Sequence, residues 1–166
     1  KRHFDLFIRA VERGVVYPCL CSRQDIKIAV QSLASAPHGT DVAPSLQYSG
    51  KCRNLALGSL DKTNLHTVTW RFKNENIAGI DDFSIARTSG LALEFSDFVP
   101  AYQWACAIDD WDGRYDVLVR AWDLSPVIKA QRAVQRFVAQ LENIENPKLP
   151  CVFHTALVTH DDGSRL

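Results

Sequence analysis

The chain contains no methionine, not even at position 1, although it is 166 residues long. A sequence of this kind is expected of a processed product or of a fragment of a longer chain. It also has no apolar run near the roughly 20 residues that a membrane-spanning helix needs, and its first residues do not have the pattern of a signal peptide. These absences argue against a membrane partner and lead us to expect a cytoplasmic protein.

The sequence has no excess of charge, because 19 Lys and Arg balance 19 Asp and Glu, and apolar residues make up 46% of it. This composition is typical of one ordinary globular domain or a large piece of one, and it argues against a disordered or fibrous protein. The zero balance argues against a histone-like binder of polyanions. The charge is uneven, however, because residues 1–53 carry a net charge of +4 and residues 54–126 one of −5. A local basic patch is therefore still allowed.

Apolar periodicity predicts a helix at the start of the chain, over residues 1–13, with Gly14 as its stop. Residues 15–21 are too short and interrupted for a helix, and we interpret them as a strand that runs into a tight turn. Ser22 looks like the N-cap of a second helix, since an acidic residue follows three positions later. Residues 34–50 are rich in Ala, Ser, Pro and Gly, which indicates an exposed loop.

The rest of the chain predicts strands and one long helix. Residues 68–72 alternate apolar and polar side chains, as a half-buried strand does. The apolar runs 104–108 and 117–119 are interpreted as two buried strands of one sheet. Residues 125–144 open with Ser-Pro, a strong helix start, and then keep the helical period. A last strand is predicted over residues 152–158, so that strand, helix and strand form an α/β arrangement.

The cysteines give the sharpest chemical signal. Five are present, namely Cys19, Cys21, Cys52, Cys106 and Cys151. An odd count favours a reducing compartment, with metal ligands or free thiols in place of a disulfide framework. Cys106 and Cys151 lie in apolar runs and are interpreted as small core residues.

Cys19 and Cys21 are separated by one residue, so both thiols can reach one tetrahedral ion from a tight turn. Zn²⁺ prefers thiolate sulfur, and structural zinc sites have four ligands. Cys52 would be a third ligand, and Tyr48, four residues before it, is a candidate fourth although tyrosine is an uncommon zinc ligand. The conventional alternatives are His38 and His66. The competing interpretation is a pair of buried thiols with an unrelated third cysteine.

Four stretches of the chain, taken in order, resemble the glutamyl-tRNA synthetase family. They are residues 17–23 together with 48–53, residues 96–99, residues 101–110, and residues 119–124 followed by Gln131. His154 and the ending 162–166 also fit. The third and fourth stretches contain Ala-Tyr-Gln and Asp-Leu, where the discriminating enzymes have Thr-Tyr-Asn and Glu-Asp-His. In this respect the chain resembles the small glutamyl-Q tRNA(Asp) synthetase branch of the family.

The resemblance implies an α/β fold, the second half of a Rossmann-like class I catalytic domain that carries a zinc-binding insertion. Residues 1–66 would form a helix and the insertion, and residues 67–166 the second half of the catalytic domain. By position, the structural zinc ligands would be Cys19, Cys21, Tyr48 and Cys52.

The same resemblance implies that Tyr102 and Arg120 hold the glutamate substrate. An arginine can pair bidentately with a carboxylate, which agrees with this role. Two alternatives remain open from the residues themselves. Arg120 would form an ion pair with Asp123 or Asp110, and Tyr102 would be a core aromatic. Gln131 and Asp123 are interpreted as structural.

The function that the resemblance implies is ATP-dependent glutamylation of the queuosine base of tRNA(Asp) by a monomeric parent ligase. Its partners would be L-glutamate, ATP with Mg²⁺, and tRNA(Asp). The family's His-x-Gly-His and Lys-Leu-Ser-Lys motifs, which bind ATP, are absent from these residues, so we expect the chain alone to be inactive. It also has Ala121-Trp122 where the family has Gly-Ala, which places a large side chain beside the implied pocket.

Three alternatives stay open. One is a fragment of a glutamyl-tRNA synthetase that charges tRNA(Glu). Another is a non-catalytic zinc-bearing module whose basic residues contact RNA phosphates, or simply form a solvated face. Those basic residues are Arg13, Arg23, Lys27, Lys51 and Arg53. The weakest is a hydrolase in which Cys106 pairs with His154 or His160, because an apolar setting raises a thiol pKa and lowers its reactivity.

Overall fold

The computed structural model describes residues 1–22, 24–25, 48, 50–55, 67–75, 77–78, 80–158 and 160. Its contacts divide the chain into two units, Lys1–Ala101 and Tyr102–Leu166, and each is described by itself. Among these residues there is no helix of the length and apolarity that crossing a membrane requires. The boundary predicted at residue 66 lies outside the described residues, and the predicted domain division stays a prediction.

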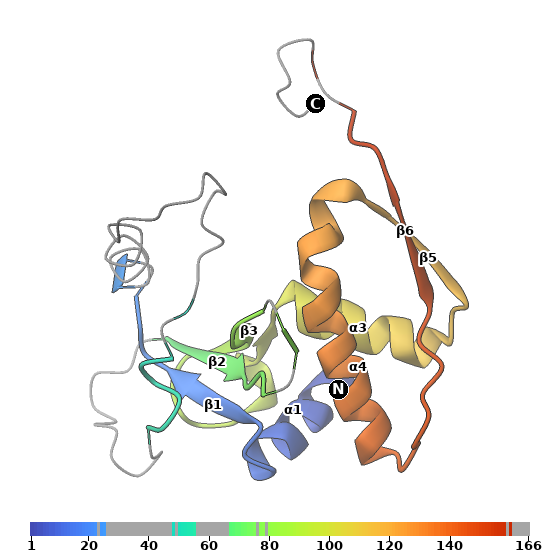
Figure 1. Ribbon diagram of the computed structural model, residues 1–166. Helices are drawn as coiled ribbons and strands as arrows, with labels where there is room; N and C mark the ends of the chain where they lie inside the picture. The colour runs from blue at the N-terminus through green and yellow to red at the C-terminus, as the bar shows by residue number, and fades with distance from the viewer. Residues whose placement is uncertain are drawn as a thin grey trace. The chain divides into compact units, whose positions relative to one another are not determined.

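The first unit is built on a four-stranded antiparallel sheet with the strand order β1-β2-β3-β4 (Figure 1). The strands are β1 (Val16–Cys19), β2 (Val68–Phe72), β3 (Phe83–Thr88) and β4 (Val99–Pro100). Tyr17 on β1 lies opposite Arg71 on β2. The register between β2 and β3 shifts between Trp70 and Arg71. The strands predicted over residues 15–21 and 68–72 are thus present, and they are neighbours.

One helix, α1 (Arg2–Glu12), covers part of this sheet. The buried ring of Phe7 meets the buried indole of Trp70 edge-on, with ring centres 5.3 Å apart. The helix ends where the sequence predicts, because Gly14 has a φ of 67°, a conformation that favours glycine. The backbone N–H groups of Gly14 and Val15 donate to carbonyls of the last turn, which completes a Schellman-type end.

Two short segments flank the strands of this unit. The 3₁₀ turn η3 (Phe95–Asp97) leads into β4, and Phe95 and Phe98 contact the ring of Phe4 on α1. The predicted capping pair is also present, since Ser22 N–H donates to the Asp25 carboxylate and Asp25 N–H to the Ser22 hydroxyl. The body of the helix predicted after Ser22 and most of the loop predicted over residues 34–50 lie outside the described residues.

The second unit pairs two parallel strands with two helices (Figure 1). Its elements are α3 (Tyr102–Gly113), β5 (Val117–Ala121), the 3₁₀ helix η4 (Trp122–Val127), α4 (Ile128–Leu141) and β6 (Cys151–Thr155). Parallel strands need a crossover connection, and α4 supplies it between β5 and β6. Trp104 and Ile108 of α3 and Val134 and Val138 of α4 are fully buried, and α3 packs on α4. The α/β arrangement predicted for this half is confirmed at that level.

Four predictions for this half are wrong. Residues 104–108 belong to the helix α3 and do not form a strand. The prediction failed because a short apolar run is equally consistent with a buried strand and with a buried helix. The strand at 117–119 exists but is not buried, since Val119 is 65% exposed. The helix predicted over 125–144 is shorter, because Ser125 and Pro126 lie in η4 and Asn143, with a φ of 58°, ends the helix early. Cys151, interpreted as a core residue, is exposed, and Cys106 is half-buried.

Candidate functional site

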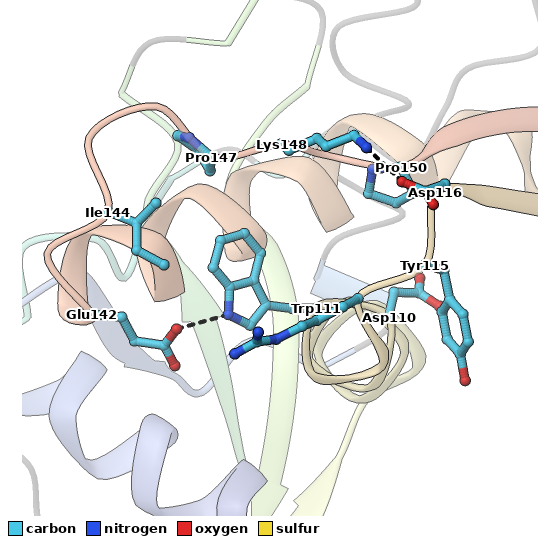
Figure 2. Close-up of a pocket in the computed structure, with 10 residues that line it drawn as sticks. Asp110, Trp111, Tyr115, Asp116, Glu142, Ile144, Pro147, Lys148 and Pro150 are labelled. Carbon is cyan, nitrogen blue, oxygen red and sulfur yellow. Dashed lines mark hydrogen bonds and ion pairs between the residues drawn. The ribbon is translucent and has the colours of Figure 1, made fainter.

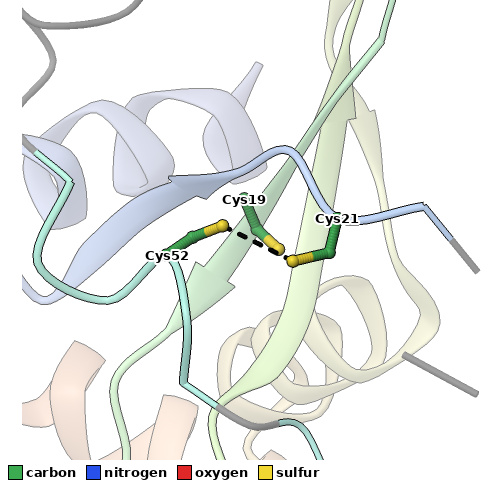
Figure 3. A group of neighbouring side chains, drawn as sticks. All are labelled: Cys19, Cys21 and Cys52. Atoms are coloured by element: carbon green, nitrogen blue, oxygen red, sulfur yellow. Dashed lines mark hydrogen bonds between the residues drawn. The ribbon is translucent and has the colours of Figure 1, made fainter. Parts of the chain in front are cut away.

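Three of the five cysteines lie together in the first unit. The sulfur atoms of Cys19, Cys21 and Cys52 all lie within 4.8 Å of one another. Cys21 Sγ and Cys52 Sγ are 3.5 Å apart, and Figure 3 shows the three thiols pointing toward one another. Cys19 and Cys52 are buried, whereas Cys21 is partly exposed. Three thiols so placed are able to hold one metal ion.

Tyr48 adds an oxygen atom to the same cluster. Its hydroxyl lies 3.3 Å from Cys19 Sγ and accepts the backbone N–H of Cys52 at 3.0 Å. The side chain is 8% exposed and belongs to a buried group that contains Tyr17, Cys19 and Cys52. The four residues singled out in the sequence as ligands therefore converge. The histidine alternatives, His38 and His66, lie outside the described residues.

Local backbone structure explains why these groups meet. Cys19 is the last residue of β1, and Cys21 follows the strand end by two positions. Cys52 sits in a turn in which Arg53 N–H donates to the Gly50 carbonyl at 2.9 Å. Gly50 has a φ of 73°, so glycine suits this turn. A strand end and a tight turn thus present their thiols to one point, as in many zinc knuckles.

Two separations in the cluster are close to those expected around a tetrahedral ion. Zinc–sulfur bonds of about 2.3 Å place two sulfurs about 3.8 Å apart, and a zinc-bound oxygen lies about 3.5 Å from a zinc-bound sulfur. The Cys21–Cys52 separation of 3.5 Å and the Cys19–Tyr48 separation of 3.3 Å are close to these values. The donor set of three sulfurs and one oxygen is also one that zinc accepts.

The electrostatic setting differs between the thiols. Burial acts to raise the pKa of Cys19, but the interactions of this thiol with Tyr48 and Arg71 outweigh burial, so that the Cys19 pKa is lowered. Burial raises the pKa of Cys21, and the neighbouring Cys52 and Cys19 raise it further. Burial also raises the pKa of the Tyr48 hydroxyl. Cys19 therefore loses its thiol proton more readily than Cys21 does. A metal ion that binds Cys21 would have to displace its proton.

Asp82 has a buried carboxylate that contacts both cysteine-bearing segments. It accepts the Tyr17 hydroxyl at 2.7 Å and the backbone N–H of Asn74 at 2.8 Å. It also pairs with Arg53, whose Nε lies 3.5 Å from the carboxylate. Tyr17 precedes Cys19 by two positions and Arg53 follows Cys52 directly. Asp82 and Arg71 were not predicted as site residues, because neither stands in a sequence motif that would single it out.

Arg120, the first implied glutamate ligand, lies on β5 in the second unit. Its Nη1 donates to the Gln131 side-chain oxygen at 2.7 Å, and its Nη2 pairs with the Asp110 carboxylate. The Arg120 and Asp110 side chains are 11% and 10% exposed. The ion pair with Asp110, left open as an alternative, is therefore present. Gln131 is 3% exposed and orients the guanidinium, in agreement with a structural role.

Tyr102, the second implied glutamate ligand, begins α3 and is 43% exposed, so it is not a core aromatic. Burial raises the pKa of Tyr102, a hydrogen bond with Cys106 adds to this, and the positive charge of Arg120 opposes it. Tyr102, Arg120 and Asp110 are thus close enough to interact. Whether they bind glutamate stays a prediction.

The surroundings of Cys106 and His154 do not support the hydrolase alternative. Burial raises the pKa of Cys106, whose neighbours in the described residues are Tyr102, Arg120 and two aspartates. The ring of His154 faces the exposed Trp122 at 5.8 Å. A thiol that is hard to ionise is a poor nucleophile.

The basic residues named for the RNA-binding alternative differ in their exposure and in their ion pairs. Arg53 is engaged by Asp82 and, at 3.9 Å, by Glu75. Arg13 and Lys51 are exposed, while Arg23 and Lys27 lie outside the described residues. The described part of the chain therefore offers two exposed basic side chains out of the predicted set.

A hollow of about 410 Å³ lies elsewhere in the second unit, where α3 and α4 end (Figure 2). The Trp111 indole N–H donates to Glu142 at 3.0 Å along its wall, and Lys148 pairs with Asp116 at 2.6 Å. Tyr102 and Arg120 do not line it, although Asp110 does. The implied glutamate ligands are therefore not part of this hollow.

The comparisons with known proteins can be set beside this geometry. The chain is 31% identical over 171 aligned residues to the glutamyl-Q tRNA(Asp) synthetase of Nocardia farcinica (strain IFM 10152), an alignment that covers 95% of this chain and 48% of that protein. The chain thus spans about half the length of this curated relative. No family model matches the chain.

Two solved structures are similar at lower identity. The glutamate-tRNA synthetase of Elizabethkingia anophelis has a TM-score of 0.46 at 15% identity, covering 99% of this chain and 35% of that one. A glutamate tRNA ligase of Elizabethkingia meningosepticum, in complex with its amino acid, has a TM-score of 0.44 at 15% identity, covering 95% and 33%.

The curated relative is a synthetase of the glutamyl type by name, and this match confirms the predicted resemblance to that family. The Nocardia farcinica relative is named glutamyl-Q tRNA(Asp) synthetase, which is the branch that the sequence resembles.

Proposed function

We propose that this chain is the second half of the Rossmann-like catalytic domain of a glutamyl-Q tRNA(Asp) synthetase. The parent enzyme would activate L-glutamate with ATP and Mg²⁺ and transfer it to the queuosine base of tRNA(Asp). The observation that carries this proposal is the 31% identity to such a synthetase over 95% of the chain. Activation of this kind depends mainly on positioning and on charge stabilisation around the phosphates.

The β5-α4-β6 unit supports the Rossmann-like part of the proposal. Parallel strands joined by a helix are the repeating unit of doubly wound sheets, and such sheets are normally covered on both faces. Here Val119 on β5 is 65% exposed and Phe153 on β6 is 60% exposed. Apolar side chains on the open face of a parallel pair are expected if the pair is part of a larger sheet.

In the proposed enzyme, Arg120 and Tyr102 hold the amino acid. A guanidinium has five N–H donors, and Gln131 and Asp110 engage two of its groups. The remaining donors are oriented but not used up by these contacts, and Tyr102 offers an exposed hydroxyl close by. Such a pair is suited to a substrate carboxylate.

The proposed role of the cysteine cluster is to hold a structural Zn²⁺ through Cys19, Cys21, Tyr48 and Cys52. Bound zinc would supply folding free energy to the first unit and take no part in the chemistry. The support is the convergence of the four side chains and the match of two of their separations to a tetrahedral site.

The test uses the complete protein encoded by the reading frame that contains this chain. Transfer of radiolabelled glutamate is measured to tRNA(Asp) with queuosine, to tRNA(Asp) without it, and to tRNA(Glu). We expect labelling of the queuosine-containing tRNA(Asp) alone, and a loss of at least tenfold for Arg120→Ala. Labelling of tRNA(Glu) would replace the proposal by a glutamyl-tRNA synthetase, and no labelling with retained RNA binding would replace it by a binding module.

A further inference from the structure

Arg71 is a buried cation beside the cysteine cluster. It is 8% exposed, and its guanidinium carbon lies 3.8 Å from the centre of the Tyr48 ring. Its Nη1 donates to the backbone carbonyl of Asp82 at 3.2 Å, and its positive charge lies close enough to Cys19 to act on that thiol. Arg71 therefore contacts one of the four proposed metal ligands and lies near a second.

This arginine has no carboxylate partner among the described residues. The ion pairs found there do not include Arg71, and its Nε has no hydrogen-bond partner in the same part of the chain. Asp82 offers Arg71 its carbonyl, while its carboxylate is engaged by Tyr17 and Arg53. A buried charge is unfavourable unless an opposite charge compensates for it. Besides Asp82, whose carboxylate Tyr17 and Arg53 already engage, the neighbours of Arg71 that can carry negative charge include the cluster's own ligands.

The charges of a loaded cluster would complement this arginine. Three thiolates around a divalent ion leave an excess of one negative charge, and one guanidinium cancels it. Groups outside the ligand shell tune a metal site in this way, and their removal typically lowers metal affinity about 10–100-fold.

The strand geometry accounts for the placement of the side chain. Trp70 and Arg71 are adjacent in β2, and both are buried. The register of β2 against β3 shifts between them. Such irregularities re-aim side chains next to functional sites. Trp70 contacts Phe7 on α1, while Arg71 reaches Tyr48, so the two neighbours serve different parts of the unit.

We propose that Arg71 is the built-in counter-cation of this metal site, a positioning residue that strengthens divalent metal binding by neutralising the thiolate ligands. The inference rests on the proposed zinc site. It goes beyond that site because it assigns the charge balance to a residue that is not a ligand.

The experiment measures zinc affinity of the whole chain by competition with a chelator, for the wild type, Arg71→Met and Arg71→Lys. Methionine keeps most of the apolar stem and removes the charge, whereas lysine keeps the charge. We expect Arg71→Met to bind zinc about 10–100-fold more weakly and Arg71→Lys to retain most of the affinity. The absorption spectrum of the cobalt-loaded chain should stay that of a thiolate-rich tetrahedral site in both variants.

Two control variants separate charge from packing. Arg87→Met removes the same charge from an exposed position of β3. Trp70→Phe removes an indole that donates to the Thr88 hydroxyl at 2.8 Å, so it loosens the same strand without changing charge. Both should keep wild-type zinc affinity.

Several outcomes would overturn the inference. These are an unchanged affinity in Arg71→Met, an equal loss in Arg71→Lys, an equal loss in Trp70→Phe, or loss of the tetrahedral cobalt spectrum in Arg71→Met. The last would mean that Arg71 merely holds the ligands in place. A wild-type chain without zinc affinity would instead refute the proposed zinc site itself.

Discussion

The two candidate sites differ in whether their side chains already have a partner of opposite charge within the protein. In the first unit, Cys19, Cys52 and Tyr48 are buried and face one another, with a cation beside them. In the second unit, Arg120 already has an anionic partner, Asp110. The cluster consists of groups suited to enclose a cation, whereas the arginine already forms an ion pair within the protein.

This difference teaches how far each site depends on a ligand. A cluster of ionisable ligands is stabilised by the ion that it encloses, so its folding and its metal binding are coupled. The Arg120 pair is stable by itself and leaves the exposed Tyr102 available. We therefore expect metal removal to weaken the first unit and glutamate removal to leave the second unit folded.

The strongest way to break this comparison is to remove a thiol. We expect Cys19→Ser and Cys52→Ser to reduce zinc from about one ion per chain to almost none and to lower the thermal stability of the first unit by more than any other change discussed. Elemental mass spectrometry of the purified chain, without added zinc, is the measurement.

The matched control for the thiol variants is Cys151→Ser, which changes an exposed cysteine that is not in the cluster. It should keep full zinc content. Unchanged metal content in both cluster variants would refute the site.

A second change probes the arginine pair. Arg120→Met leaves Asp110 buried without a partner, and breaking a buried pair in this way typically costs about 3–5 kcal/mol of unfolding free energy. Urea denaturation at neutral pH measures the loss. The double variant Arg120→Met with Asp110→Leu should recover most of it, since no charge then remains buried. A single variant as stable as the wild type would show that the pair is not needed for folding.

The smallest effect is expected at the exposed pair of Lys148 and Asp116, whose side chains are 85% and 76% exposed. The hydrogen bond and charge of Lys148 hold the pKa of Asp116 below its ordinary value. Its stabilising contribution is therefore present above the ordinary carboxyl pKa and lost as the pH falls through the lowered value. We expect Lys148→Gln to shift the urea midpoint barely at pH 7, and not at all in high salt. A clear shift in high salt would contradict this.

The sequence was sufficient for features that depend on local patterns. The helix before Gly14, the capping pair of Ser22 and Asp25, and the strand over residues 68–72 follow from spacing and residue type. The convergence of Cys19, Cys21, Tyr48 and Cys52 agrees with the ligand set that the family resemblance implies.

Other features depend on contacts that no local pattern carries. Residues 104–108 have the composition of a buried strand, but packing against α4 stabilises them as a helix. Arg71 alternates with apolar neighbours, so its side chain would be expected to face solvent. Tyr48, a residue 23 positions away, covers it instead. Asp82 likewise acquires its importance from Tyr17 and Arg53, which are distant in sequence.

The closeness of Cys21 and Cys52 has a further consequence for oxidation chemistry. Their sulfur atoms lie 3.5 Å apart, so a small movement would bring them to bonding distance. A bound metal engages the sulfur lone pairs that would otherwise react with an oxidant such as molecular oxygen. Chelation in air would therefore convert the cluster into a disulfide and abolish rebinding, while chelation under a reductant would leave it able to take up the ion again. Zinc bound to this chain would thus protect the cysteines that hold it from oxidation.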